Sequence, residues 1–371
     1  MMSYNIPNEV LSTIFSYLMT DLQKRRLHHD SVTDIWPVRL VCRRWNDLAT
    51  QQLFQMLPLF HSQETAEEGF SSWQHLLDSS AIRAAARCVA IGTAPWDDLY
   101  GGHDPDVWAT WADKGEWPEF TSAIDRICDL PHLNTIEVRF SEYCIGRDGD
   151  QSNPDFEPAA TRKQTLQRVL KAIRQRAADH PNASVIRELV LENLQNMPLP
   201  KSLTDGLLQH IQRLHILIAT EQHGTEEADI QLRERREYGP YLQGTLLPSV
   251  AVQLVELTLC DVIWGAIPGE FNGKGLHFPR LKTLTLEGYV TTRRDQFDWV
   301  LAQKSLSSLR MHSCTIASHC LVLQPDFASW GVDLRGWKWV AEPPDEEELE
   351  RPSGISYIGP PGEHLLTQAG T

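Results

Sequence analysis

The apolar residues of the first sixty positions recur at helical spacing. Pro7 precedes the first set and suits the start of a helix, where its missing N–H costs nothing. The first set comprises Val10, Leu11, Ile14, Phe15 and Leu18. A second set, after a basic stretch, comprises Trp36, Leu40, Val41, Trp45, Leu48 and Phe54. The pattern predicts a helical module over 1–56, too small to be stable without a partner surface in the same chain or another.

A different pattern repeats along the rest of the chain: an apolar residue, a second three positions later and a third two positions after that. Its seven copies are Ala86, Val89, Ile91; Leu133, Ile136, Val138; Ile186, Leu189, Leu191; Ile211, Leu214, Ile216; Leu254, Leu257, Leu259; Leu281, Leu284, Leu286; and Leu306, Leu309, Met311. The copies are 47, 53, 25, 43, 27 and 25 residues apart, so the repeats are irregular.

Helical or loop segments precede these copies. The clearest helix is expected over 161–177, where Thr161 and Gln164 resemble a capping box. Its apolar stripe is Leu166, Val169, Leu170 and Ile173. A helix followed by a short strand, repeated, predicts an α/β solenoid over 65–340 that is similar to leucine-rich repeats, with Asn193 as one possible ladder asparagine. The fold expected for the whole chain is mainly α-helical at the N-terminus, followed by this solenoid.

Residues 341–371 combine Pro, Gly and a run of carboxylates with few large apolar side chains. Such a composition cannot bury enough surface to offset the entropy of ordering. We therefore expect a mostly disordered acidic tail.

The net charge of −15 excludes a general nucleic-acid or anionic-membrane footprint. Most of the excess acid lies in two segments: residues 97–157 carry 15 acidic and 4 basic side chains, and the tail carries 7 and 1. The N-terminus has neither the basic region of a signal peptide nor a long apolar run. Seven scattered cysteines without Cys-x-x-Cys favour reduced thiols and a cytoplasmic or nuclear protein.

Candidate chemistry is weak. The run GEFNGKG lacks the first Gly and the final Ser or Thr of a phosphate loop. The pairs His28–His29 and His210–His215 have no neighbouring ligand at a zinc spacing, so no metal, cofactor or catalytic residue is expected.

The segment 95–120 gathers Trp96, Trp108, Trp111 and Trp117 with several aspartates. It fits a recognition loop for a basic peptide, but we favour an insertion that packs its tryptophans on the solenoid and leaves its acids in water. The basic residues over 162–176 similarly favour a solvated helix face over a nucleic-acid site.

The run from Ile6 to Leu18, followed by Arg-Leu-Val-Cys-Arg-Arg-Trp-Asn-Asp-Leu-Ala over 39–49, resembles an F-box, with a longer and more basic loop over 20–32. The resemblance implies docking on a Skp-type adaptor and, through it, on a cullin-RING ubiquitin ligase. It also implies that adaptor-facing and core positions are among Pro7, Val10, Leu11, Ile14, Leu18, Val41, Cys42 and Trp45. Such docking is helix-in-groove recognition by apolar anchors. An F-box followed by irregular repeats resembles the divergent F-box proteins common in fungi.

If the repeated leucines point inward, the alternate strand residues form an exposed polar face, which in a solenoid is the natural surface for a target protein. The expected target-binding residues on this face are Glu137, Arg139, Glu192, His215, Thr258, Thr285, Glu287, Arg310 and His312. An error of one residue in the assumed strand register would place all of these side chains in the core.

Three functions are compatible with these features. The first is the non-catalytic substrate-recognition subunit of an SCF-type ligase, which binds a Skp-type adaptor and an unknown protein substrate and acts by proximity. The second is an interaction scaffold whose N-terminal helices only cap the solenoid. The third, an enzyme, is weakest because no nucleophile, base and oxyanion donor stand together in the sequence.

Overall fold

The computed structural model describes residues 6–24, 37–60, 66–93, 111, 117–142, 144–145, 156–199, 201, 206–219, 221–222, 233–267, 269–317, 319–323, 337–340 and 363–368. The chain divides into two compact units. Unit 1 comprises 1–103, 114–138 and 167–186, and unit 2 comprises 104–113, 139–166 and 187–371.

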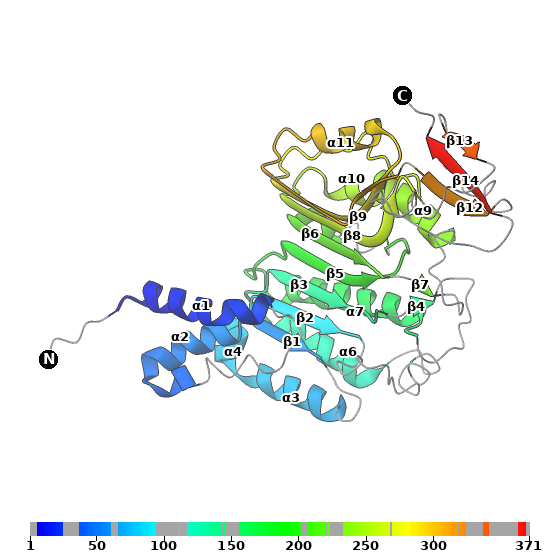
Figure 1. Ribbon diagram of the computed structural model, residues 1–371. Coiled ribbons are helices and arrows are strands. Elements are labelled where there is room, and N and C mark those ends of the chain that lie inside the picture. Colours follow the sequence, from blue (N-terminus) through cyan, green and yellow to red (C-terminus); the bar gives the residue numbers. More distant parts are fainter. Residues whose placement is uncertain are drawn as a thin grey trace. The chain divides into compact units, whose positions relative to one another are not determined.

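An all-parallel sheet follows the N-terminal helices, as the repeated pattern predicts (Figure 1). Its strands lie side by side in the order in which they occur along the chain. They are β1 (Met56–Leu59), β2 (Cys88–Gly92), β3 (Thr135–Arg139), β5 (Glu188–Leu194), β6 (Arg213–Ile218), β8 (Glu256–Gly265), β9 (Thr283–Thr291) and β10 (Ser308–His312). The short β11 (Thr315–Ile316) also pairs with β9. The predicted α/β region is confirmed, and its architecture is compatible with leucine-rich repeats.

The repeated apolar triplets are the core of this sheet. The eighteen side chains of the first six copies are each at most 3% exposed. Strand pairing aligns their middle members, so that Leu189, Leu214 and Leu257 are consecutive partners. The seventh copy differs, because Leu309 and Met311 are 41% and 46% exposed. They lie on β10, the last strand in the order of the described sheet, and no further described strand of this sheet pairs with it.

The structure adds a copy of the triplet that the sequence analysis missed. Phe54, Leu57 and Leu59 have the same spacing, and Leu57 and Leu59 are 2% and 1% exposed. They pair with Val89 and Ile91 of β2. In the sequence, Phe54 also continues the helical spacing of Trp45 and Leu48, and this conceals the repeat. The first strand therefore begins at Met56, where the helical module was expected to end.

One backbone motif recurs where the strands begin. A single carbonyl accepts the N–H groups of two successive residues in the next repeat. In unit 1, the Gln55 carbonyl accepts from Arg87 and Cys88 at 2.8 and 2.9 Å. In unit 2, the Gln212 carbonyl accepts from Val255 and Glu256 at 2.7 and 3.1 Å. These bonds satisfy two backbone N–H groups at the start of each strand and hold the strand in register with its neighbour.

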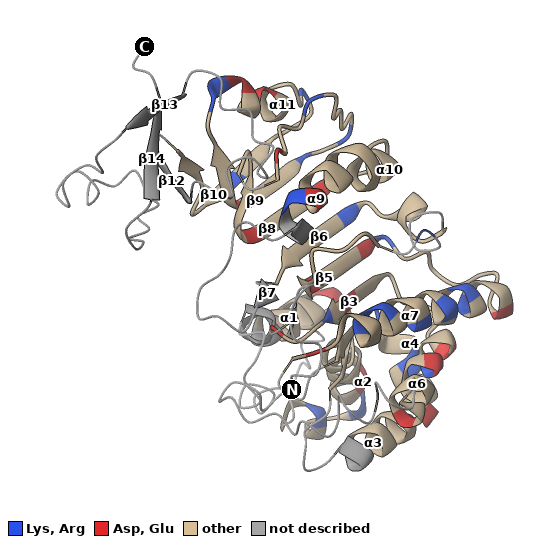
Figure 2. Ribbon diagram, turned by 90° about the vertical axis from the view of Figure 1, so that its right-hand side faces the viewer, with Lys and Arg blue, Asp and Glu red and all other residues tan. Residues whose placement is uncertain are grey.

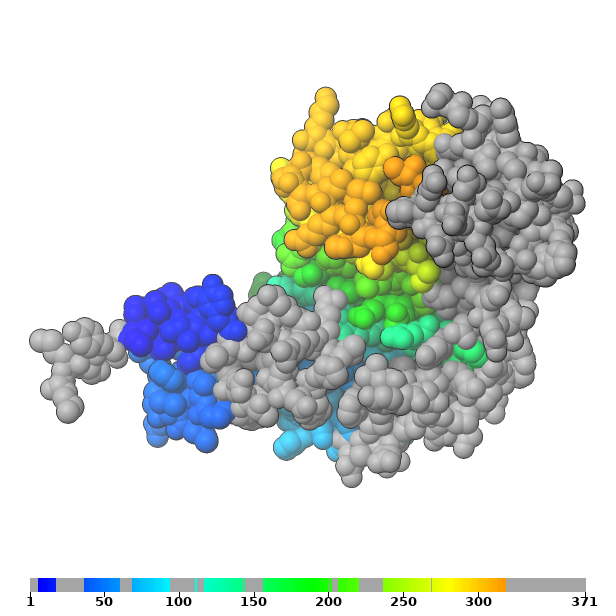
Figure 3. Space-filling view, viewed as in Figure 1, coloured from blue at the N-terminus to red at the C-terminus, as the bar shows by residue number. Residues whose placement is uncertain are grey.

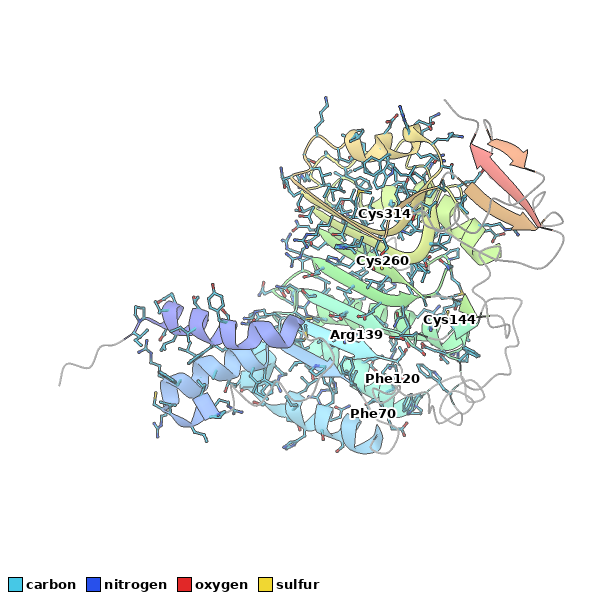
Figure 4. The ribbon with its side chains drawn as sticks, viewed as in Figure 1. Phe70, Phe120, Arg139, Cys144, Cys260 and Cys314 are labelled. Atoms are coloured by element: carbon cyan, nitrogen blue, oxygen red, sulfur yellow. The ribbon has the colours of Figure 1, made fainter. Side chains whose placement is uncertain are left out.

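Helices connect the strands. In unit 1 they are α3 (Ala66–Asp78), α4 (Ser80–Ala85), α6 (Pro118–Asp125), η4 (Arg126–Asp129) and the end of α7 (Ala159–Asp179). In unit 2 they are the start of α7, η5 (Leu208–His210), α9 (Arg233–Tyr241), the π-helical η6 (Leu242–Leu246), α10 (Leu247–Val250), η7 (Arg294–Phe297) and α11 (Asp298–Leu301). Phe70 of α3 and Phe120 of α6 lie with ring centroids 5.9 Å apart (Figure 4).

Helix α7 confirms the helix expected over 161–177, but it begins two residues earlier. Thr161 is therefore inside the helix, where its hydroxyl donates to the Pro158 carbonyl at 2.7 Å instead of capping. Three members of the expected stripe, Leu166, Val169 and Leu170, are buried.

The arginines of α7 mostly serve the fold, although the helix is visibly basic (Figure 2). In unit 1, Arg176 is 3% exposed and donates to the carbonyls of Leu130, Pro131, Leu133 and Ser184 at 2.5 to 3.2 Å. Its burial lowers the pKa of the guanidinium. In unit 2, Arg162 bonds the carbonyls of Asn193 and Ser141 and lies 3.3 Å from Glu157.

A residue with left-handed backbone recurs within or just after three strands of unit 2, β5, β9 and β10. Asn193, Gly288 and Ser313 have φ of 57°, 69° and 50°, and each stands seven residues after the first apolar residue of its repeat. The Asn193 side chain also donates to the Phe140 carbonyl at 3.0 Å, as a ladder asparagine would. At Gly288, within β9, there is no space for a side chain, because a Cβ would lie 2.0 Å from the Asp261 carbonyl oxygen.

The remaining described strands lie outside the parallel sheet. The strands β12 (His319–Leu323), β14 (Glu363–Gln368) and β13 (Trp337–Val340) form an antiparallel sheet, and β4 (Cys144–Ile145) pairs with β7 (Glu221–Gln222). The expected disordered tail, 341–371, lies outside the described residues except for β14, a paired strand that the composition did not predict.

We predict that Gly288→Ala lowers the free energy of unfolding by about 2–4 kcal/mol, because it adds left-handed strain and a backbone clash. Gly244→Ala is the matched control, since nothing lies within 4 Å of its added Cβ, and its effect stays below about 1 kcal/mol. Thermal or denaturant unfolding measures both, and equal stability of the two variants would contradict the left-handed, closely packed backbone at Gly288.

Candidate functional site

The N-terminal module consists of α1 (Asn8–Lys24), η2 (Pro37–Leu40) and α2 (Arg43–Leu53). Its core contains Leu11, Phe15, Ala49 and Leu53, with Val38, Trp45, Leu48 and Phe54 partly buried around them. Phe15 meets Trp45 edge to face, with ring centroids 5.4 Å apart. In Figure 3, α1 (dark blue) lies against α2 (lighter blue).

Polar contacts fix the start of α1 on α2. Arg44 donates to the Asn8 side chain at 2.7 Å and to the Ile6 carbonyl. Gln52 donates to the Ser12 hydroxyl at 2.8 Å. With one face of α1 held in this way, the opposite face is turned to solvent.

That opposite face is apolar. Ile6, Val10, Ile14 and Tyr17 follow one another three or four residues apart and are 41%, 46%, 46% and 75% exposed. Leu40 and Val41 are 87% and 60% exposed. Single exposed apolar residues are ordinary on protein surfaces, but a contiguous row of them is typical of an interaction surface. We call these six residues the apolar stripe.

The structure divides the eight residues implied by the F-box resemblance into two groups. Leu11 is 2% exposed and Trp45 is partly buried, so both belong to the core of the module. Exposed positions are Pro7, Val10, Ile14, Val41 and Cys42. Leu18 lies in α1, but its side chain is outside the described residues.

Ile6, Tyr17 and Leu40 were not among the implied adaptor residues. Continuing the four-residue spacing backwards from Val10 and Ile14 would have identified Ile6. The sequence pattern places Leu40 in the apolar set of a second helical segment, but the structure interrupts that segment at Val41 and Cys42. The interruption leaves Leu40 at the end of the short η2, where its side chain is 87% exposed.

We predict that Leu11→Ala lowers the free energy of unfolding of the module by about 2–5 kcal/mol, because it opens a cavity in the core. The adjacent Val10→Ala changes this free energy by no more than about 0.5 kcal/mol, because Val10 is 46% exposed. Thermal unfolding of the two variants tests the division between core and surface, and a similar loss in both would refute it.

A second candidate surface is the polar face of the sheet in unit 2. Strand pairing places Val190, His215, Thr258, Thr285 and Arg310 in one row across five strands. His215 Nδ1 lies 2.8 Å from the Thr258 hydroxyl, and its Nε2 lies 3.6 Å from the Glu188 carboxylate. Arg213 donates to the same carboxylate at 2.7 Å.

The nine residues expected on this face differ in exposure. Glu287, Arg310 and His312 are exposed. Arg139, Glu192, His215, Thr258 and Thr285 are partly buried, and Arg139 pairs with Glu192 at 3.2 Å. Glu137 is an error of the sequence analysis, because its side chain is 3% exposed. Alternation along β3 does not expose Glu137, since neighbouring structure covers that position.

Reactive groups in this region are held in unreactive forms. Burial, followed by a hydrogen bond to Glu287, raises the pKa of the Cys260 thiol on β8 to about 12, so it stays protonated (Figure 4). None of the cysteine side chains that the structure describes forms a disulfide. Within the described ranges, no group of three or more His, Cys, Asp or Glu could hold a metal ion. No described helix is both long and apolar enough to cross a membrane.

Most of the acidic, aromatic segment lies outside the described residues, including Trp96 and Trp108. Two of its tryptophans are described. In unit 2, Trp111 is 4% exposed and donates to Gln164 at 2.8 Å. In unit 1, Trp117 packs edge to face on Phe70, with ring centroids 5.2 Å apart. These two side chains serve packing, in agreement with the favoured interpretation.

An F-box-like family model matches residues 4–57. The match covers α1, η2 and α2 and ends within β1. No curated protein matches the chain. Residues 4–57 are thus an F-box-like domain, and such a domain implies binding to a Skp-type adaptor.

Proposed function

We propose that this chain is the substrate-recognition subunit of an SCF-type ubiquitin ligase. The F-box-like domain binds a Skp-type adaptor, and the polar face of the sheet binds a target protein. F-box proteins are typically non-catalytic, and the contribution of this chain is to hold the target near the ubiquitin-loaded enzyme. The repeats are of the leucine-rich type and carry the target surface.

The apolar stripe is the observation that supports adaptor binding. Its side chains lie on α1, just before it at Ile6, and at the junction of η2 and α2, whereas the core of the domain does not include them. A partner groove that covers them removes apolar surface from water without disturbing the domain. Residues such as Val10 and Ile14, at the middle of the stripe, are the expected anchors.

The connection between the F-box-like domain and the first repeat supports a role in positioning. Only two residues separate the end of α2 at Leu53 from the start of β1 at Met56. The Gln55 carbonyl between them accepts two hydrogen bonds from the second repeat. A bound adaptor would therefore be linked to the first strands of unit 1 by a short, hydrogen-bonded connection.

The same connection supports the alternative, a scaffold whose N-terminal helices only cap the repeats. Residues 1–56 include the first residue of the terminal strand β1, so their deletion would damage the sheet under either hypothesis. Substitutions on the surface distinguish the two hypotheses, whereas the deletion does not. A cap needs only the buried core residues, but a docking domain also needs the exposed apolar stripe.

We predict that the double variant Val10→Glu with Ile14→Glu lowers affinity for a Skp-type adaptor by about tenfold or more, because carboxylates would enter an apolar groove. The melting temperature stays close to that of the parent chain, since both residues are about half exposed. Pull-down with purified adaptor and thermal unfolding are the measurements.

Gln51→Glu provides the control, because it adds a carboxylate to an exposed position of α2 outside the stripe. Full adaptor binding by the folded double variant, or no binding by the parent chain, would support the scaffold instead.

The target surface is proposed to centre on Glu287, Arg310 and His312, the exposed members of the polar face. Mixed charge without large aromatic side chains suits a polar protein ligand. Arg139 and Glu192 neutralise each other at 3.2 Å and are expected to contribute less.

We predict that Arg310→Glu with Glu287→Lys removes the target from affinity-purified complexes while the adaptor remains bound, because the reversed charges repel the complementary surface. Arg294→Glu is the control, since Arg294 is exposed on η7 and outside the strands. Quantitative mass spectrometry of the three purifications is the measurement. Identical protein profiles for the parent and the double variant would place the target surface elsewhere.

A further inference from the structure

A small cavity lies at the carboxyl ends of β5, β6 and β8 in unit 2. Its volume is about 30 Å³. Apolar side chains such as Ile216, Leu242 and Leu259 form part of the wall, and Asn196, Tyr238 and Asp261 add polar groups. The cavity therefore borders α9 on one side and the ends of the strands on the other.

Two polar groups in the wall have no protein partner among the described residues. Tyr238 and Asn196 are each 4% exposed. Neither the Tyr238 hydroxyl nor the Asn196 Nδ2 makes a hydrogen bond to another described group. Buried polar groups in folded proteins almost always have a partner, either protein or ordered water. Two exceptions in the wall of one cavity point to an occupant.

Size and charge restrict the occupant. Ligand pockets usually measure hundreds of Å³, whereas about 10–15 Å³ of accessible volume holds one water molecule. Asp261 lies close enough to raise the pKa of Tyr238 further, after burial and Tyr241, so an anion is disfavoured. The Cys260 thiol, which also lines the cavity, has a pKa of about 12 and offers no thiolate to a metal ion.

We infer that this cavity is an internal hydration site, in which one or two water molecules bridge the Tyr238 hydroxyl and the Asn196 amide. Water both donates and accepts, so it satisfies the Asn196 N–H groups and the Tyr238 hydroxyl together. The bridge connects α9 to the end of β5, two elements of unit 2 that are about forty residues apart in the sequence.

Tyr238→Phe separates this proposal from its alternative. If water bridges the hydroxyl, the variant loses a hydrogen-bonded group and leaves Asn196 poorly satisfied, so the melting temperature of the full chain falls by a few degrees, about 2–4 °C. If the hydroxyl has no partner, its removal relieves a buried polar group and the melting temperature rises. An unchanged or higher melting temperature overturns the proposal.

Tyr241→Phe is the matched control on the same helix. The Tyr241 hydroxyl accepts directly from the Leu199 N–H at 3.0 Å, so this variant shows the cost of losing a known hydrogen bond. Adaptor binding should be unaffected in both variants, which keeps the result separate from the proposed function.

A crystal structure of the full chain, alone or with its adaptor, gives a direct test. We expect ordered density within about 3.2 Å of both Tyr238 Oη and Asn196 Nδ2. An empty cavity in a map that shows other buried waters would refute the hydration site, and so would a direct bond between the two side chains.

Discussion

Stacking of apolar side chains between neighbouring parallel strands is the constraint on which the rest of the structure depends. Each repeat buries its triplet only when the next strand is in register, as Leu214 does between Leu189 and Leu257. The shared carbonyl bonds at the strand starts impose the same register. At β10, the last strand in the described sheet order, Leu309 and Met311 of the seventh triplet stay exposed.

This constraint also explains why arginines of α7 are buried, a role that the sequence does not distinguish from binding a ligand. The loops that connect the strands contain carbonyl groups that need hydrogen-bond donors. Buried arginines provide several of these donors. Arg176 bonds four carbonyls in unit 1, and Arg162 bonds two in unit 2. A basic helix therefore stabilises the loops, which is a structural use of charge that composition cannot distinguish from a binding surface.

The F-box-like domain follows a different rule, because it leaves apolar residues exposed. The core formed by Leu11, Phe15 and their neighbours is satisfied internally, and the apolar stripe is additional to it. The short connection from α2 to β1 joins this surface to the first repeat. The proposed receptor function depends on this combination of an uncovered docking face and a repeated sheet that carries a separate polar face.

The sequence by itself determined the helical module, its F-box resemblance and the register of six buried triplets, because local spacing decides which side of a helix or strand is apolar. Only the tertiary structure decided which apolar residues of α1 are core and which are surface, since Val10 and Leu11 look alike in sequence. It also revealed the hidden repeat at Phe54, Leu57 and Leu59 and the burial of Glu137. Whether a side chain is buried depends on the groups that pack against it, and these groups come from residues that are distant in the sequence.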